Sequence, residues 1–358
     1  MSSLSENPPP KGIPFLEFTW HLKKDILELC EPPELIKLSL VSKRCKKIVG
    51  SCQRFPLLID ITMDQEFKIF IFNPRKITSS FTWLLGNYVT VKRNPHFSFE
   101  NVFPTRIESS LNKNTSHDET SEFQTHCSRR GSACLRSTLS HLSEIFPNFK
   151  VRIIDVNAKL WDSSVFGAMD MNKIMECVQK TRMLQIDAEF INREMIHLME
   201  KVKCTRRLYC KAENTMGCIL NGTLQCSDWI VAENFRWFDA EQFQDLHCQL
   251  MRLVKTRITT RNVEDLIIKW RNSEDQLGKG VKNIKFIDVQ IHGGVQNFGF
   301  SRVGAQPKGS VERPNEFTEF NCDYDFTNAF DIIHPDGTLA SLKVVEVLDR
   351  VMFVVWNR

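Results

Sequence analysis

Residues 31–44 read EPPELIKLSLVSKR, and this stretch decides how the N-terminal region folds. Proline fixes φ and is tolerated in the first turn of a helix, so Pro32 and Pro33 separate one helix from the next. Apolar residues then recur at helical spacing through residues 35–41. We therefore expect a short helix that is apolar on nearly all sides.

A small bundle of about three short helices is expected around this stretch, over residues 13–51. The helix before it carries Leu22, Ile26 and Leu27, and a basic run over residues 43–47 begins the helix after it. Segments below about 40 residues rarely bury enough surface to fold alone. The apolar surplus must therefore be covered by the following domain or by another protein, and the pattern leaves both alternatives open.

The composition is that of an ordinary folded protein. The chain has 358 residues, of which 42% are hydrophobic and 25% charged, with a net charge of +4. This length predicts two or three domains of roughly 100–200 residues each. The weak, dispersed charge does not indicate nucleic-acid binding, and no stretch approaches the ~20 apolar residues of a membrane helix. Residues 1–11 resemble no secretory signal, so we expect the 12 cysteines to be reduced thiols in the cytoplasm or nucleus.

Changes in composition divide the chain into five parts. We expect a disordered tail over residues 1–12, the helical module over 13–52, strands that begin a larger domain over 53–104, a polar flexible insertion over 105–148, and an α/β domain over 149–358. The insertion is rich in Ser, Thr, Asn and His and is expected to hold at most one helix, near residues 135–145.

The last part alternates strand-like and helix-like segments, each unit a few tens of residues long. One such helix spans residues 261–270, with Trp270 on its apolar side. This alternation is typical of an irregular leucine-rich-repeat-like α/β fold. Pro335-Asp336-Gly337 predicts the turn of a β-hairpin, and the apolar run over residues 351–356 predicts a final buried strand. The expected fold class is therefore α+β or α/β.

The helical module resembles the F-box motif. Its second half is the more specific part, through the 31–35 turn and the Leu-Ser-x-x-Ser-Lys-Arg run over residues 38–44, whereas Thr19 stands where the family usually has proline. This resemblance implies a domain that docks a Skp-type adaptor and, through it, cullin and RING subunits of an SCF-type ubiquitin ligase. The residues implied to form or support this docking surface are Leu16, Phe18, Ile26, Leu27, Pro32, Leu35, Ile36, Leu38 and Val41.

The larger domain resembles the F-box-associated domain (type 2) of the large nematode-expanded F-box family. The matching segments lie at residues 247–249, 259–266, 269–270, 328–332 and 336–340. Together the two resemblances imply a substrate-recognition adaptor that performs no chemistry and needs no cofactor. Its partners would be the Skp-type adaptor and a protein substrate, with no nucleic acid and no membrane.

Two alternative functions remain from the sequence: a protein-interaction scaffold outside any ligase, and a Cys-dependent hydrolase. The candidate nucleophile–base pairs for the hydrolase are His126-Cys127 and His247-Cys248. A zinc site is also conceivable from a further group of cysteines: Cys204, Cys210, Cys218 and Cys226. Their spacing is wider than the pairs of structural zinc sites, so buried thiols are the favoured interpretation and no metal is expected.

Overall fold

The computed structural model of the chain describes residues 14–52, 56–64, 67–72, 80–87, 107–112, 121–127, 131–160, 176–215, 217–220, 222, 224–246, 248–274, 280–309 and 312–356. The tail expected over residues 1–12 lies outside these ranges.

The N-terminal module consists of three α-helices after a single 3-10 turn. Its elements are η1 (Phe15–Glu17), α1 (Trp20–Leu29), α2 (Pro32–Val41) and α3 (Lys43–Ser51). Polar residues fix where the helices begin. Thr19 Oγ1 accepts a hydrogen bond from the Leu22 amide, Glu34 Oε2 accepts one from the Glu31 amide, and Ser42 Oγ accepts one from the Cys45 amide. Such caps satisfy amides that have no partner inside the helix.

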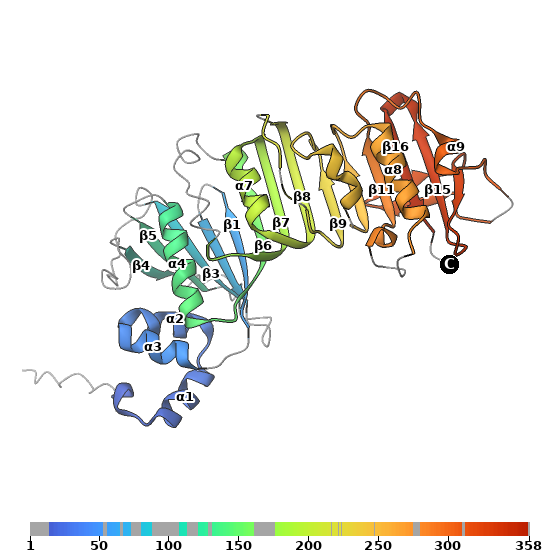
Figure 1. Cartoon of the computed structure of the whole chain (residues 1–358). Helices are drawn as coiled ribbons and strands as arrows, with labels where there is room; N and C mark the ends of the chain where they lie inside the picture. Colours follow the sequence, from blue (N-terminus) through green and yellow to red (C-terminus); the bar gives the residue numbers. More distant parts are fainter. Residues whose placement is uncertain are drawn as a thin grey trace, which may run out of the picture.

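Helix α4 (Gly131–Ile145) joins this module to the rest of the molecule, as Figure 1 shows. It buries three leucines, Leu135, Leu139 and Leu142, in the same core that contains Leu35 and Ile36 of α2. Two polar contacts cross this interface as well. Ser39 Oγ lies 2.8 Å from His141 Nε2, and Lys46 Nζ lies 2.6 Å from a carboxylate oxygen of Glu144. The larger domain therefore covers one side of the helical module.

One sheet of 14 strands runs through the described part of the chain, in the order β14-β15-β16-β11-β10-β9-β8-β7-β6-β1-β2-β3-β5-β4. Its parallel centre comprises β1 (Leu58–Met63), β6 (Lys150–Asn157), β7 (Lys180–Ile191), β8 (Lys203–Thr215), β9 (Trp229–Ala232), β10 (Leu250–Leu253) and β11 (Phe286–Gln290). From β6 to β11 the strands lie side by side in chain order, which gives the elongated shape in Figure 1.

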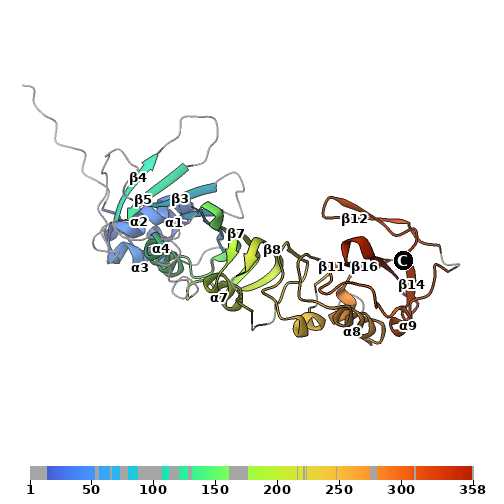
Figure 2. The same cartoon turned by 90° about the horizontal axis from the view of Figure 1, so that it is seen from above.

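Helices cover one face of this parallel run. They are α7 (Arg193–Lys201), η4 (Ala240–Asp245) and α8 (Thr260–Arg271), and Figure 2 shows α4, α7 and α8 on the same side of the strands. In β9 and β10 buried residues alternate with half-buried ones. Parallel sheets usually have both faces covered and read as continuous apolar runs. The alternation here follows from the covering of a single face.

The C-terminal strands close the other end of the sheet. Strand β16 (Arg350–Val355) pairs antiparallel with β11, followed by β15 (Leu339–Val345) and β14 (Phe330–Ile333). The turn between β14 and β15 is the predicted one: Gly337 has φ of 86°, and Asp336 Oδ1 accepts from the Thr338 amide at 2.9 Å. A separate hairpin of β12 (Glu316–Glu319) and β13 (Cys322–Asp325) lies on the face opposite α8, where Phe317 stacks on Phe286 at 4.9 Å between ring centroids.

The described segments within residues 105–148 form two strands and one helix, where a polar flexible insertion with at most one helix was expected. Strands β4 (Ile107–Asn112) and β5 (Ser121–Cys127) pair there at the end of the sheet, beside β3 (Ser80–Asn87) and β2 (Phe67–Phe72), and α4 follows them. Their residues are mainly Ser, Thr, Glu and Gln, which carry little of the apolar alternation that marks a strand. These strands are formed through backbone pairing with β3, which the side-chain pattern does not predict.

Gly50 allows α3 and α4 to cross closely, and its replacement by alanine is expected to destabilise the fold. A Cβ at position 50 would lie 2.6 Å from the backbone oxygen of Glu144. We expect Gly50→Ala to lower the free energy of unfolding by about 1–3 kcal/mol, the usual cost of overpacking, as measured by urea titration. Gly309→Ala is the matched control because no atom lies within 4 Å of its added Cβ. Equal or greater stability for Gly50→Ala would contradict the close crossing.

His141 makes this interface sensitive to acid. Burial, and secondarily the charge of Lys46, lowers its pKa from 6.5 to about 3. Because the folded-state pKa lies below the unfolded one, the unfolded chain binds the proton first, and stability is lost as pH falls from 6.5 towards 3. We expect unfolding free energy to drop by about 1–2 kcal/mol between pH 6.5 and pH 5.

Urea titrations at both pH values, with His141→Gln as comparison, measure this effect. The Ser39 hydroxyl gives its single proton to the Ile36 carbonyl at 2.6 Å, so Nε2 of His141 is the donor to Ser39. The glutamine amide can still donate to Ser39 but does not titrate. Identical pH slopes for the two proteins would show that His141 is not the titrating group.

Candidate docking face and candidate substrate face

Helix α1 presents an apolar stripe to solvent. Leu22, Ile26 and Leu29 lie at i, i+4 and i+7, which places them on one side of the helix. Leu22 is 45% exposed and Leu29 is 86% exposed, whereas Leu27 on the other side is completely buried. One residue thus anchors the helix, and its outer stripe is left uncovered.

Helix α2 is divided in the same way. Leu35, Ile36 and Leu40 face α4 and the core, whereas Val41 is 73% exposed and Leu38, three residues earlier on the same side, is half-buried. We use the term docking face for the exposed and half-buried apolar residues of α1 and α2, which are Trp20, Leu22, Ile26, Leu29, Leu38 and Val41. An apolar surface of this kind on an otherwise ordinary protein indicates an interaction site.

The nine residues expected to form or support the docking surface separate into three groups. Leu27, Pro32, Leu35 and Ile36 are buried and can act only from beneath. Half-buried positions are occupied by Leu16, Phe18, Ile26 and Leu38, and Val41 is exposed. The structure adds three exposed apolar residues that the sequence-based set did not contain: Trp20, Leu22 and Leu29. The i, i+4, i+7 spacing in α1 is the signal that could have identified two of them.

The uncovered face of the parallel sheet is the second candidate surface. Strand register places two rows of side chains across it: Met183, Arg207, Trp229 and Leu250 in one, and Gln185, Tyr209, Val231 and Arg252 in the other. The rows continue into β11 with Phe286 and Asp288, which are buried, Phe286 beneath the hairpin of β12 and β13. The Arg207 guanidinium lies 5.9 Å from the centroid of the Trp229 ring. Mixed aromatic, apolar and charged side chains on a broad face suit contact with a protein better than chemistry on a small molecule.

The charges on this face are largely paired. Arg152 donates to both carboxylate oxygens of Asp60, at 2.9 and 2.5 Å, and Lys159 Nζ lies 2.8 Å from Asp187. Asp155 has a raised pKa because it is partly desolvated and lies near other carboxylates. These ion pairs connect neighbouring elements of the sheet. They explain the charged residues on this face as structural, so no catalytic role is needed for them.

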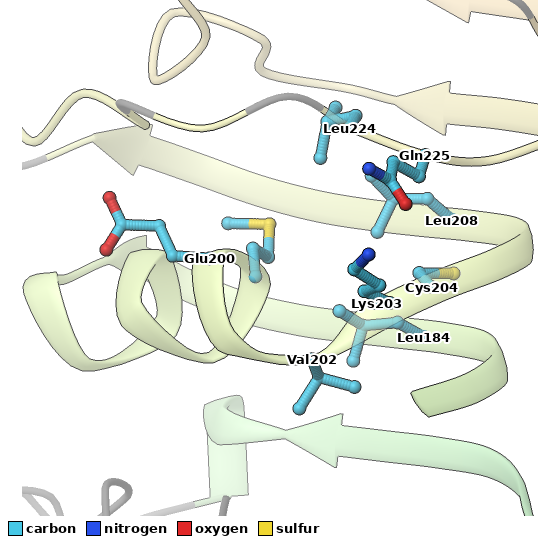
Figure 3. A pocket seen from close by; sticks show the side chains of 9 residues that line it. Leu184, Glu200, Val202, Lys203, Cys204, Leu208, Leu224 and Gln225 are labelled. Carbon is cyan, nitrogen blue, oxygen red and sulfur yellow. The ribbon is translucent and has the colours of Figure 1, made fainter. Parts of the chain in front are cut away.

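A cavity of about 220 Å³ lies between α7 and β8 (Figure 3). Figure 3 shows the Glu200 carboxylate apart from the other labelled side chains, which include Lys203 and Cys204. The Cys204 thiol donates to the Arg207 carbonyl at 2.8 Å. Acid, base and thiol therefore do not converge on one point in this cavity, as a nucleophilic mechanism would require.

The remaining cysteine hypotheses find no support in the described residues. Cys248 is fully buried, and burial raises its pKa to about 12, so its thiol is not poised for nucleophilic attack. His247 and the side chains of His126 and Cys127 lie outside the described parts of the structure. Of the cysteines weighed as zinc ligands, Cys204, Cys210 and Cys226 are buried and Cys218 is half-buried. Among the described residues, no group of three or more potential ligands is placed to hold a metal.

Comparison with known proteins gives one match. Residues 15–57 match the F-box domain. Neither a curated protein nor a solved structure matches the chain. None of the described helices is both long enough and apolar enough to cross a membrane.

The match supports an F-box protein. F-box domains typically bind Skp-type adaptors, and F-box proteins are in general substrate adaptors of SCF-type ligases and not enzymes. The matched range closely follows the helical module expected over residues 13–52 and extends to the first buried residue before β1, Leu57.

Proposed function

We propose that this protein is the substrate-recognition subunit of an SCF-type ubiquitin ligase. Its docking face would bind a Skp-type adaptor, which connects it to cullin and RING subunits, and its α/β domain would bind a protein substrate in the cytoplasm or nucleus. The observation that carries this proposal is the exposed apolar face of α1 and α2 within a matched F-box domain. Such an adaptor acts by tethering, which raises the local concentration of substrate near the charged enzyme.

Burial of Leu35 and Ile36 against α4 does not weaken this proposal. The larger domain takes the inner side of α2, and the outer residues Leu22, Leu29 and Val41 are still left in solvent. The sequence left open whether the following domain or another protein covers the apolar surplus. The larger domain covers the inner side of the module, and its outer side is left for a partner. A charge at Leu35 would disrupt the core, so docking is better tested at exposed positions.

Thr19 fits docking as well, although the family usually has proline there. Proline at this position would pre-set the turn before the helix. Thr19 instead caps α1 through its hydroxyl, which accepts from the Leu22 amide. Because this side-chain cap fixes the start of α1 without a proline, the substitution gives no reason to prefer a scaffold outside the ligase.

We further propose that the α/β domain is a leucine-rich-repeat-type array of the F-box-associated kind. Its parallel strands follow one another in chain order with helices on one face. A regular interval supports this: the contacts from Cys204 to Arg182 and from Cys226 to Cys204 each span 22 residues, and Cys248 follows after the same interval. Leucine-rich repeats have 20–29 residues, and these buried thiols donate to backbone carbonyls at equivalent strand starts.

The double variant Leu29→Asp/Val41→Asp tests docking without loss of fold. Both side chains are more than two-thirds exposed, so the charges should leave folding intact but bring unpaired carboxylates into an apolar interface. We expect co-purification with a co-expressed Skp-type adaptor to fall at least about tenfold, since loss of an interface hot spot costs about 2 kcal/mol or more.

Val347→Asp is the matched control, because Val347 is an apolar residue 93% exposed at the far end of the sheet. It should bind the adaptor as the unaltered chain does. Full adaptor binding by the double variant, with an unchanged circular dichroism spectrum, would refute docking through this face.

A further inference from the structure

A cavity of about 810 Å³ lies at the N-terminal ends of the neighbouring strands β6 and β7, beside the end of α4. Its walls come from three places: the segment before and within β1 (Pro56 and Leu58), the end of α4 (Ser143 and Pro147), and the first residues of β6 and β7. Figure 1 shows α4 leading into β6 at this edge. The lining contains the end of α4, which packs against the helical module, but no residue of the docking face.

Positive charge gathers around this cavity. Lys150, Lys180 and Arg182 line it, are exposed, and make no ion pair with any other described residue. A fourth cation, Arg152, is already held by Asp60. The carboxylate that lines the cavity, Glu176, is itself paired with Arg136 at 3.2 Å. Within the described part of the chain these three cations are therefore unpaired, and they can contact an anionic ligand.

The cations lie close together because of the strand topology. Parallel strands bring their first residues to one edge, and β6, β7 and β8 each begin with lysine, at Lys150, Lys180 and Lys203. Lys180 and Lys203 are direct register partners. Lys203 lies outside the lining of this cavity, so the pair that lines it, Lys150 and Lys180, is brought together by the parallel pairing of β6 and β7. Like charges at neighbouring strand starts repel each other, and an anionic ligand would relieve that repulsion.

Four apolar residues of the lining form what we term its apolar floor: Val151 and Val178 are buried, and Leu58 and Phe149 are half-buried. A single-stranded nucleic acid would require several aromatic platforms for stacking, and Phe149 is the one aromatic residue in the lining. Cations above an apolar floor fit a peptide whose acidic side chains alternate with apolar ones.

We propose that this basic cavity binds an acidic peptide segment of the protein substrate. The inference rests on the proposed adaptor function, because it assigns the substrate class of that adaptor. The anionic groups would be carboxylates or phosphorylated side chains, both of which accept charge-assisted hydrogen bonds from lysine and arginine. Apolar side chains between them would occupy the floor at Leu58 and Phe149.

Fluorescence anisotropy with the full-length chain tests the proposal. The probes are an eight-residue peptide of alternating glutamate and leucine, the same peptide with phosphoserine for glutamate, its glutamine counterpart, and an RNA oligonucleotide. We expect both acidic peptides to bind, in a manner weakened by salt, and the glutamine peptide to bind at least about tenfold more weakly. The stronger of the acidic peptides distinguishes carboxylate from phosphate as the preferred group.

Lys180→Ala/Arg182→Ala should weaken acidic-peptide binding about tenfold, since it removes two of the three cavity cations that are unpaired among the described residues. Arg236→Ala is the control, because Arg236 is exposed, makes no ion pair within the described residues and lies outside the cavity. No binding of the acidic peptides, equal binding by the cavity variant, or a preference for the RNA would each overturn the proposal.

The adaptor proposal and this inference can fail separately. The Leu29→Asp/Val41→Asp chain should keep peptide binding while it loses the Skp-type adaptor, and the cavity variant should do the reverse. Loss of both activities in either variant, with a changed circular dichroism spectrum, would indicate misfolding, and Lys180→Gln/Arg182→Gln then repeats the test with longer neutral side chains.

Discussion

The packing of α4 against α2 and α3 is the contact on which the arrangement of the molecule depends. Gly50 lets the α3 backbone approach that of Glu144, and Ser39 and His141 form a buried hydrogen bond beside it. A short helical module with this much apolar surface cannot stand alone. By covering only the inner side of α2, α4 stabilises the module and leaves its outer side exposed. The same contact therefore creates both the support and the docking face.

The sheet shows a similar division between a covered and an uncovered face. Its parallel strands would ordinarily be buried on both sides, but here helices cover one side and the hairpin of β12 and β13 covers only the last strands of the other. As a result, much of one face of the parallel strands is exposed to solvent, as are the lysines at the starts of β6, β7 and β8. Both are features that a recognition domain can use and that a minimal stable fold would avoid.

Much of the fold could be predicted because the apolar pattern is strong where packing is tight. Helix α8, Thr260–Arg271, closely follows the predicted range 261–270 and buries Trp270, and the turn at Gly337 forms as its sequence indicates. Strands β4 and β5 were missed because their order comes from backbone pairing. The sequence alone could name the helices of the F-box but not the number of strands around them.

The docking residues were only partly predictable, for a physical reason. Leu35 and Val41 are both apolar residues of the same helix, and only the position of α4 decides that Leu35 is buried and Val41 exposed. Helix α4 follows α2 by about a hundred residues, as the 102-residue separation of Ser39 and His141 shows, so the sequence around α2 does not reveal this contact. The basic cavity was less visible still, because Lys150 and Lys180 are distant in sequence and meet only through parallel strand pairing.

Helix α4 also links the two candidate sites. Its side chains support the F-box module through His141, and its end forms a wall of the basic cavity through Ser143. A ligand in the cavity and an adaptor on the docking face would therefore be held at a separation set by one helix and not by a flexible linker. Tethering is most effective when the geometry suits both engagements at once. A buried, closely packed α4 is thus a requirement of the proposed function as well as of the fold.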